Sequence, residues 1–304
     1  MKALGALSAI ERALPGRTRR DVPMAPLTAY KVGGPAELFV EPDTAEELVA
    51  LLEIVHREQT PLFVLGAGSN LLVRDGGVRG AVLRLGREFR KVTVSGSELT
   101  AGAMAQMSKV ALAAERAGLL GLVFGYDIPG TVGGILRMNA GAHGQETQDV
   151  LAEARGYDMQ GQYHRVPAAQ IRFAYRTAIY PVELVFTEGV FDLKPGDPEA
   201  LAAQRQENHD YRMRTQPKGH SVGSVFVNPP GDHAGRLVEA AGMKGFRMGK
   251  AVVSDKHANW ILNDGGATAA DIEGLIRAIQ ARVRGSLGVE LKTEVRIIGE
   301  SLGR

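Results

Sequence analysis

Glycine is concentrated in two stretches of this chain, and this distribution most restricts how the chain can fold. The sequence has 38 glycines among 304 residues, well above an ordinary share of about 7%. Five lie between Gly66 and Gly80, and eight lie between Gly118 and Gly144. Glycine costs folding entropy and is kept where backbone bends sharply or approaches another group closely. Because Ser/Gly repeats are absent, both stretches are interpreted as shaped loops rather than flexible linkers.

The remaining composition excludes several classes of protein. Hydrophobic residues make up 44% and charged residues 23%, which excludes wholesale disorder, and the length favours two domains. A net charge of +2 argues against a nucleic-acid or membrane-surface partner. The absence of cysteine excludes disulfides, zinc-thiolate sites and thiol nucleophiles. Because charges such as Glu11 and Arg12 interrupt the N-terminal apolar stretch, we expect a cytoplasmic protein, with no obligate protein partner evident.

Apolar periodicity and capping signals predict the secondary structure. Thr44 and Thr268 are expected to cap helices, with Glu47 and Asp271 three residues on in the positions of a capping box. The expected helices are 104–116, 198–214 and 233–241, besides the two that follow these caps. The expected strands are 37–40, 61–65, 71–74, 81–85, 91–94, 184–193, 224–227 and 287–298.

The first glycine loop, Gly66-Ala67-Gly68-Ser69-Asn70, directly follows an expected strand. The third glycine of a dinucleotide fingerprint would fall at Leu71, and strand continues there instead of helix, so the Rossmann interpretation is weak. Bare backbone amides with Ser69 and Asn70 suit a pyrophosphate. An ordinary glycine turn is the alternative.

The second glycine loop comprises Ile128–Gly134 and Met138–Gly144. Pro129 restricts φ, while the glycines let the backbone pass close to a flat or anionic ligand. Asn139 offers both a donor and an acceptor. Two such loops favour a large, extended cofactor, and the alternative is a pair of glycine-rich turns.

Three polar residues are candidates for chemistry, each with a plain alternative. Arg176 follows Tyr175 and could simply form a surface ion pair. Ser224 could be a nucleophile, but the G-x-S-x-G motif of hydrolases is absent. Glu294 could pair with Lys292 or Arg296 across a strand. The seven histidines form no H-x-x-x-H or H-E-x-x-H pair, so no metal site is expected.

Taken together and in this order, these motifs resemble the UDP-N-acetylenolpyruvoylglucosamine reductase family, from about Thr28 to Ile298. The segments that carry the resemblance are GAGSNLLV from Gly66, IPGTVGG from Ile128, MNAGAHG from Met138, AYR from Ala174, GSVFVNP from Gly223 and TEVRIIG from Thr293.

The resemblance implies an α+β protein with the p-cresol-methylhydroxylase-type FAD-binding fold. Its implied parts are two FAD-binding subdomains (1–87 and 88–200) and a substrate-binding domain (201–298), with 295–304 packing back on the first. FAD is expected to be non-covalent, because no histidine lies near the first loop. The implied cofactor-binding residues are Gly66, Ala67, Gly68, Ser69, Asn70, Leu71, Gly125, Pro129, Gly130, Thr131, Gly133, Gly134, Asn139, Ala140 and Gly141.

The resemblance also implies a reaction. NADPH would reduce UDP-N-acetylglucosamine enolpyruvate to UDP-N-acetylmuramate through FAD, for peptidoglycan synthesis, with hydride reaching C3 and a proton reaching C2. Ser224 would donate that proton, Arg176 would stabilise the developing negative charge, and Glu294 would orient the intermediate.

Four residues are implied to contact the substrate, namely Tyr175, Asn228, His257 and Lys218. Lys218 would replace a family lysine, because Gln216 stands before Pro217 where that lysine is common. The short connection after Arg176 resembles the compact type of the family, without an extra substrate-covering loop.

Three other functions remain open at this point. An FAD oxidase or dehydrogenase of the same fold would not need Arg176, Ser224 and Glu294 together. A nucleotide-binding protein without catalysis would keep only the loops. A serine hydrolase would use Ser224 as a nucleophile.

Overall fold

The computed structural model describes residues 2–303, which form two compact units. Unit 1 comprises residues 2–20, 38–67 and 80–211, and unit 2 comprises residues 21–37, 68–79 and 212–303. Each unit has a hydrophobic core of its own. The last crossing between the units lies within helix α5 (Pro198–Thr215). The three-part division implied by the resemblance partitions the chain differently and stays a prediction.

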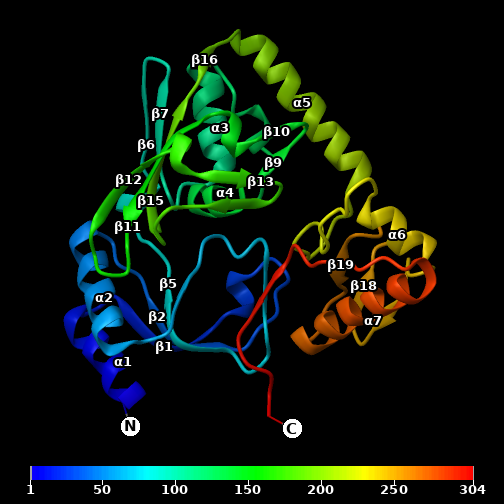
Figure 1. Cartoon of the computed structure of the whole chain (residues 1–304), viewed down its shortest axis with the longest axis horizontal. Coiled ribbons are helices and arrows are strands. Elements are labelled where there is room, and N and C mark those ends of the chain that lie inside the picture. Colours follow the sequence, from blue (N-terminus) through cyan, green and yellow to red (C-terminus); the bar gives the residue numbers. More distant parts are fainter. Residues whose placement is uncertain (1, 304) are drawn as a thin grey trace. The chain divides into compact units, whose positions relative to one another are not determined.

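The main sheet of unit 1 has five antiparallel strands in the order β12-β11-β15-β7-β6. Helix α4 (Val132–Met138) packs on β15, and helix α3 (Met107–Arg116) lies against β6, as Figure 1 shows. Both helices contribute buried residues to the core of unit 1. The strands are β6 (Val92–Ser95), β7 (Glu98–Gly102), β11 (Leu151–Tyr157), β12 (Tyr163–Pro167) and β15 (Val185–Asp192).

A second sheet has the order β1-β2-β5-β3, and three of its strands continue from one unit into the other. Helices α1 (Lys2–Ala13) and α2 (Ala45–Glu58) pack together in unit 1, at the blue end of Figure 1. The strands are β1 (Thr18–Pro23), β2 (Pro35–Val40), β3 (Leu62–Val64) and β5 (Val78–Leu83).

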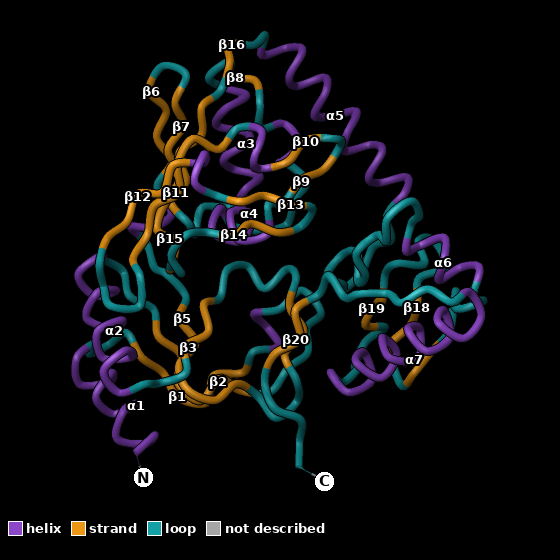
Figure 2. Tube along the Cα trace, viewed as in Figure 1, coloured by secondary structure: helices purple, strands orange, loops and turns teal. Residues whose placement is uncertain are grey.

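Short paired strands shape the loops of unit 1, and Figure 2 shows them as brief strand segments between loops. The pairs are β9 (Gly141–Ala142) with β10 (Gln145–Glu146), β13 (Arg172–Ala174) with β14 (Thr177–Ile179), and β8 (Leu119–Leu120) with β16 (Lys194–Pro195). Four 3-10 turns complete the unit, namely Glu88–Arg90, Val123–Gly125, Thr147–Asp149 and Ala168–Gln170.

Unit 2 joins a small sheet, two helices and one parallel strand pair. Helix α7 (Ala269–Leu287) packs on β17 and β18 and against α6 (Ala234–Ala240). The antiparallel sheet contains β17 (Arg247–Met248), β18 (Ala251–Val253) and β19 (Ile261–Asn263). Strand β20 (Arg296–Ile298) pairs in parallel with β4 (Leu71–Val73), and a 3-10 turn spans Ala25–Leu27.

Most expected elements are confirmed, and three differ for physical reasons. The expected helix 104–116 begins at Met107, because the backbone of Gln106 is extended, with φ −67° and ψ 131°. The expected strand 287–298 is wrong over most of its length, since only β20 is a strand. The expected strand 224–227 is likewise reduced to one isolated bridge, between Phe226 and Thr293.

The two expected helix caps are present, but they differ in detail. Thr268 and Asp271 form a reciprocal capping box at the start of α7. Thr44 accepts a hydrogen bond from the Glu47 amide. The Glu47 carboxylate, however, accepts from the amide of Asp43, one residue earlier than a capping box requires. Among residues 2–303, none of the helices combines the length and apolar character needed to cross a membrane.

A buried ion pair ties α7 to the end of β4 within unit 2. Glu273 is only 7% exposed, and its two carboxylate oxygens accept from Arg74 Nε and Nη2 at 2.9 and 3.0 Å. Arg277, one turn further along α7, also donates to Glu273. These hydrogen bonds, that from Arg74 foremost, hold the pKa of Glu273 below its ordinary value of 4.5.

We predict that Glu273→Gln lowers the free energy of unfolding by about 2 kcal/mol at pH 7, because Arg74 loses a buried charged partner. A carboxyl whose pKa is lowered by folding stabilises the protein above its unfolded pKa. The difference from wild type should therefore shrink as the pH falls below 4.5. Urea unfolding across pH measures it. Glu239→Gln, which removes an exposed ion pair with Lys244, is the control, and equal losses for the two variants at pH 7 would contradict the prediction.

Candidate functional site

Ser224 and Glu294 lie in neighbouring segments of unit 2, although 70 positions separate them in the chain. The Glu294 amide donates to the carbonyl of Val225 at 2.8 Å, and the Val227 amide donates to the carbonyl of Lys292 at 2.9 Å. Both Ser224 and Glu294 are partly exposed, while Val225 is fully buried. The structure therefore brings two of the three expected catalytic residues to one place in unit 2.

Asn70, an expected cofactor residue, lies beside Glu294. Its side-chain Nδ2 donates to the Glu294 carbonyl at 3.0 Å, and its own carbonyl accepts from the Arg296 amide at 3.1 Å. The neighbouring residue Leu71 is buried at the start of β4, so only its backbone could contact a cofactor. Asn70 thus joins the end of the first glycine loop to the segment that carries Glu294.

Gly68 explains why this loop needs glycine. Its φ is 64°, and a Cβ would come within 2.1 Å of the Leu27 carbonyl oxygen, which no backbone could tolerate. Among the described residues, the five amides from Gly66 to Asn70 donate no hydrogen bond. Unpaired amides in a tight loop are suited to bind an anionic group such as a pyrophosphate.

A buried hydroxyl in unit 1 bears on whether a cofactor fits beside the second loop. Thr131 is 4% exposed, and its Oγ1 has no hydrogen-bond partner in the part of the chain that the structure describes. A Cβ on Gly66 would lie 2.8 Å from this oxygen, and one on Gly134 would lie 3.7 Å from it. A buried polar atom without a partner is rare in proteins. The position of Thr131 Oγ1 between two glycines therefore fits a polar group of a cofactor.

Gly125, just before the second loop, and other glycines within that loop lie close to atoms of the protein itself. A Cβ on Gly125 would lie 2.3 Å from Met107 Cε, and one on Gly141 would lie 2.2 Å from the Gln145 carbonyl oxygen. Gly133 approaches the backbone of Ala103, while the Gly130 carbonyl accepts from the Met107 amide at 2.9 Å. Pro129 is exposed, and Ala140 donates its amide to Ile135. Their binding of a cofactor stays a prediction.

Arg176 occupies the tip of the hairpin formed by β13 and β14 in unit 1. Ala174 and Thr177 pair across the turn, and Arg176 adopts a left-handed conformation with φ 56°. Such a φ costs energy in a residue that has a Cβ, and it is enriched where function requires a set geometry. The guanidinium lies 4.9 Å from the ring centroid of Tyr175, a cation–π contact between the two residues of the turn.

Asn139 is hydrogen-bonded to this hairpin. It is fully buried and left-handed, with φ 42°. Its Nδ2 donates to Glu146 Oε2 at 2.8 Å and to the Ala174 carbonyl at 3.3 Å, while its Oδ1 accepts from the Gln148 amide at 3.0 Å. Both donors are therefore used inside the protein, and a contact between Asn139 and a cofactor is left to its backbone.

The expected substrate residues divide into exposed and structural positions. Tyr175 is 49% exposed, and Lys218 is exposed as well. Asn228 Oδ1 accepts from the amide of Ala234 at 3.0 Å and so caps the start of α6. His257 Nδ1 accepts from the Asn259 amide at 3.2 Å, and burial lowers the pKa of His257, which keeps the ring neutral at pH 7. Substrate contacts of these residues stay predictions.

Sequence reasoning missed Asn259, which organises the segment after Ser224. Asn259 is 3% exposed. Its Oδ1 accepts from the Phe226 amide at 2.9 Å, its Nδ2 donates to the Phe226 carbonyl at 2.8 Å, and its own carbonyl accepts from the Val225 amide at 2.8 Å. The sequence signal for this role is the asparagine between the apolar residues Ala258 and Trp260. An asparagine that is buried with such neighbours needs hydrogen-bond partners inside the protein.

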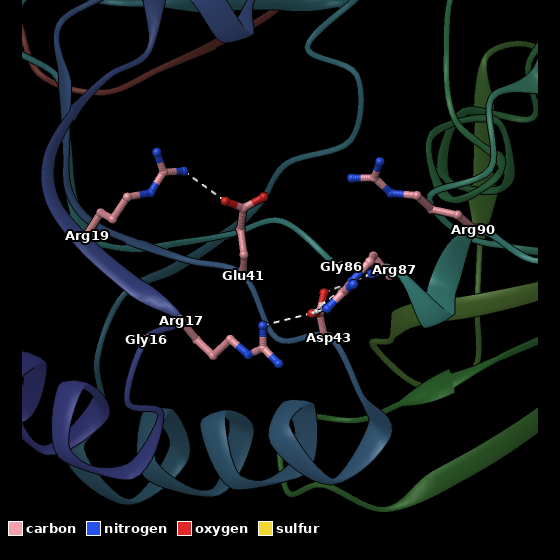
Figure 3. Close-up of a pocket in the computed structure, with 8 residues that line it drawn as sticks. All are labelled: Gly16, Arg17, Arg19, Glu41, Asp43, Gly86, Arg87 and Arg90. Carbon is pink, nitrogen blue, oxygen red and sulfur yellow. Dashed lines mark hydrogen bonds and ion pairs between the residues drawn. The ribbon is translucent and has the colours of Figure 1, made fainter.

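A pocket of about 260 Å³ in unit 1 contains none of the expected site residues. Its carboxylates are held by arginines: Glu41 pairs with Arg19 at 2.8 Å, and Asp43 pairs with Arg17 at 2.7 Å (Figure 3). The pocket is thus a feature of the ion pairing of unit 1. Across residues 2–303, no group of three or more His, Asp or Glu side chains could hold a metal ion.

Comparisons with known proteins agree on one family. Residues 216–298 match the profile of the UDP-N-acetylenolpyruvoylglucosamine reductase C-terminal domain, and residues 36–167 match an FAD binding domain. The UDP-N-acetylenolpyruvoylglucosamine reductase of Anaeromyxobacter sp. (strain Fw109-5) is 47% identical over 96% of this chain and 92% of that protein. The enzyme of the same name from Bradyrhizobium sp. (strain ORS 278) is 44% identical over 96% of both chains.

Solved structures show the same relationship. The crystal structure of UDP-N-acetylenolpyruvylglucosamine reductase from Thermus caldophilus superposes with a TM-score of 0.82 and 36% identity, over 92% of this chain and 98% of that chain. Berberine bridge enzyme from Eschscholzia californica, at 14% identity, has a TM-score of 0.51 over 64% of this chain and 44% of that chain. The latter likeness concerns the fold alone, which is the expected α+β FAD-binding fold with an additional C-terminal domain.

We predict that Asn139→Ala lowers the free energy of unfolding by about 2–3 kcal/mol, because the three hydrogen bonds of the buried Asn139 side chain, to Glu146, Ala174 and Gln148, are lost. Urea unfolding measures the loss. Asn139→Gly serves as the matched variant, because it also lacks the side chain but adopts the left-handed backbone without strain. The glycine variant should be less destabilised than the alanine variant and still less stable than wild type. Wild-type stability in both variants would show that the Asn139 network does not support the fold.

Proposed function

Because the chain belongs to the UDP-N-acetylenolpyruvoylglucosamine reductase family, we propose that it reduces UDP-N-acetylglucosamine enolpyruvate to UDP-N-acetylmuramate with NADPH and FAD. The product serves peptidoglycan precursor synthesis. The observation that carries the proposal is the pairing of the Ser224 segment with the Glu294 segment, at positions that match the family's motifs. We also propose that the reaction takes place in the cytoplasm, with no nucleic acid, membrane or obligate protein partner.

FAD is the cofactor that the two glycine loops suit best. The unpaired amides from Gly66 to Asn70 would bind its pyrophosphate, and the buried Thr131 hydroxyl would donate to it or accept from it. When bound, FAD would supply the hydride chemistry between NADPH and C3 of the enolpyruvyl group, with N5 as the hydride-transferring atom. We propose non-covalent binding, because no histidine lies in the first loop.

Three residues of this chain carry the remaining chemistry. Ser224 donates a proton to C2, so that hydride at C3 and this proton together saturate the double bond. The Arg176 guanidinium stabilises the negative charge that develops toward the substrate carboxylate when C3 accepts hydride. Glu294 orients that intermediate. A left-handed Arg176 stacked on Tyr175 supports this role, because the turn restricts the guanidinium before the substrate arrives.

The substrate nucleotide would be bound by exposed polar residues. Lys218 supplies a cation for the diphosphate, and Tyr175 offers a ring and a hydroxyl at the hairpin tip. Asn228 retains its Nδ2 for the sugar while its Oδ1 caps α6. His257 retains its Nε2, because its Nδ1 already accepts from Asn259.

We predict that NADPH reduces the flavin of Ser224→Ala at the normal rate. The enolpyruvyl sugar nucleotide should reoxidise this flavin about 10²–10⁴-fold more slowly than in wild type, because C2 lacks its proton donor. Anaerobic stopped-flow absorbance of the flavin measures both half-reactions. Ser286→Ala, an exposed position on α7, should change neither. If wild-type protein is not reoxidised by this substrate, the proposed function is wrong. If Ser224→Ala is reoxidised at the normal rate, only the donor assignment is wrong.

We predict that Gly66→Ala is purified with much less than one FAD per chain, because the added Cβ would lie 2.8 Å from Thr131 Oγ1 and crowd the cofactor. Flavin absorbance after denaturation measures the ratio of FAD to protein. Gly285→Ala, where a Cβ meets nothing within 4 Å, is the control and should retain wild-type FAD. Full FAD occupancy in Gly66→Ala would place the cofactor away from Thr131.

A further inference from the structure

Asn259 is buried in unit 2, is outside the proposed set of reacting residues, and binds both residues that follow Ser224. Its carbonyl accepts from the Val225 amide, and its side chain makes one hydrogen bond in each direction with the Phe226 backbone. We infer that Asn259 is a positioning residue: it fixes the backbone after Ser224 so that the serine hydroxyl is held ready to donate its proton. The inference rests on the proposed function, in which Ser224 is the donor.

The backbone after Ser224 is hydrogen-bonded on both sides. Asn259 satisfies the Val225 amide and both polar groups of Phe226, while the Glu294 amide satisfies the Val225 carbonyl at 2.8 Å. All four backbone polar groups of these two residues are therefore paired, three of them by Asn259. Val225 and Phe226 are 0% and 1% exposed. Because no water reaches these groups, losing the Asn259 amide would leave two of them unpaired.

Ser224 itself depends on this support. Within the described part of the chain, Ser224 makes no hydrogen bond of its own. The preceding residue, Gly223, is left-handed with φ 81°, and a Cβ there would meet nothing closer than Trp260 at 3.9 Å. In the same described residues Gly223 makes no hydrogen bond either, whereas the polar backbone groups of the two residues after Ser224 are all paired. The direction of the Ser224 side chain is therefore set by the residues that Asn259 binds.

An amide of this length provides both hydrogen bonds at any pH. The Phe226 amide requires an acceptor and the Phe226 carbonyl requires a donor, and the asparagine side chain carries one of each. An ionised aspartate keeps the acceptor but places negative charge against the carbonyl. A protonated aspartate again carries a donor and an acceptor. Burial raises the pKa of a carboxyl, so protonation of an introduced aspartate is accessible in mildly acidic solution.

The experiment compares Asn259→Asp with Asn263→Asp. Asn263 is the matched control, because it is also buried in unit 2 and also uses one donor and one acceptor, to the Tyr30 carbonyl and from the Ala267 amide. Both variants lose one buried amide, so comparable losses in Tm are expected. Anaerobic half-reactions of the FAD-loaded full chain then separate a positioning role from a structural one.

We expect Asn259→Asp to slow reoxidation by the enolpyruvyl sugar nucleotide at least about tenfold at pH 8, because proton transfer loses its alignment. Reduction by NADPH should stay within about twofold of wild type, since proton donation from Ser224 is absent from that step. Asn263→Asp should change neither step. The ratio of variant to wild-type reoxidation should rise toward one as the pH falls to 6. His257 and Glu294 are the titratable groups that face this segment, and Asn259→Ser, which adds no ionisable group, reports their contribution to the pH dependence.

Three outcomes would overturn the inference. In the first, Asn259→Asp slows both half-reactions equally. In the second, it leaves both rates unchanged, as is expected of Asn263→Asp. In the third, the ratio of its reoxidation rate to that of wild type does not rise at lower pH. Asn259→Ser is measured in parallel as the variant that retains a small hydroxyl and folds if Asn259→Asp does not. In Asn259→Ser only the rate of reoxidation should fall, and this rate should not recover at lower pH. A fall in the rates of both half-reactions would again overturn the inference. Failure of wild-type protein to be reoxidised contradicts the proposed function instead, so the two failures are distinguishable.

Discussion

The hydrogen bond from the Glu294 amide to the Val225 carbonyl is the interaction on which the candidate chemistry depends. It belongs to a continuous backbone array within unit 2, in which Asn259 binds Val225 and Phe226, these face Thr293 and Glu294, and Asn70 binds Glu294 in turn. Four segments distant in the sequence are thereby held together. Ser224 and Glu294 extend from this array as partly exposed side chains, so buried backbone supports both of these proposed reactive residues.

Glycine serves two purposes in the loops, and the surrounding atoms distinguish them. Gly68 and Gly141 stand where a Cβ would lie 2.1 and 2.2 Å from backbone carbonyl oxygens, so they are required by packing. Gly66 and Gly134 instead flank the Thr131 hydroxyl, which has no partner among residues 2–303. The high glycine content therefore reflects the close approach of protein segments and, in the proposed function, also the space for a ligand. Composition alone could not separate these causes, because each requires the same small residue.

Arg176 in unit 1 and Ser224 in unit 2 are each supported by a buried asparagine. A buried asparagine, Asn139, donates to the Ala174 carbonyl just before the hairpin tip, as Asn259 binds the backbone just after Ser224. Each asparagine lies within a motif that also carries expected contact residues. An asparagine in such a motif can therefore act by fixing backbone, and its position in the sequence does not reveal whether its amide faces a ligand or the protein.

The sequence by itself determined the family, the FAD-binding fold and the order of the motifs, because short motifs and capping residues act locally. The α7 capping box at Thr268 and Asp271 is such a local feature. Tertiary structure alone decided that residues 287–295 form no strand, since Val225 and Val227 pair with them at only a few positions. It also decided that Asn139 and Asn259 bind backbone, because the partners of a buried amide are brought to it by segments far away in the chain.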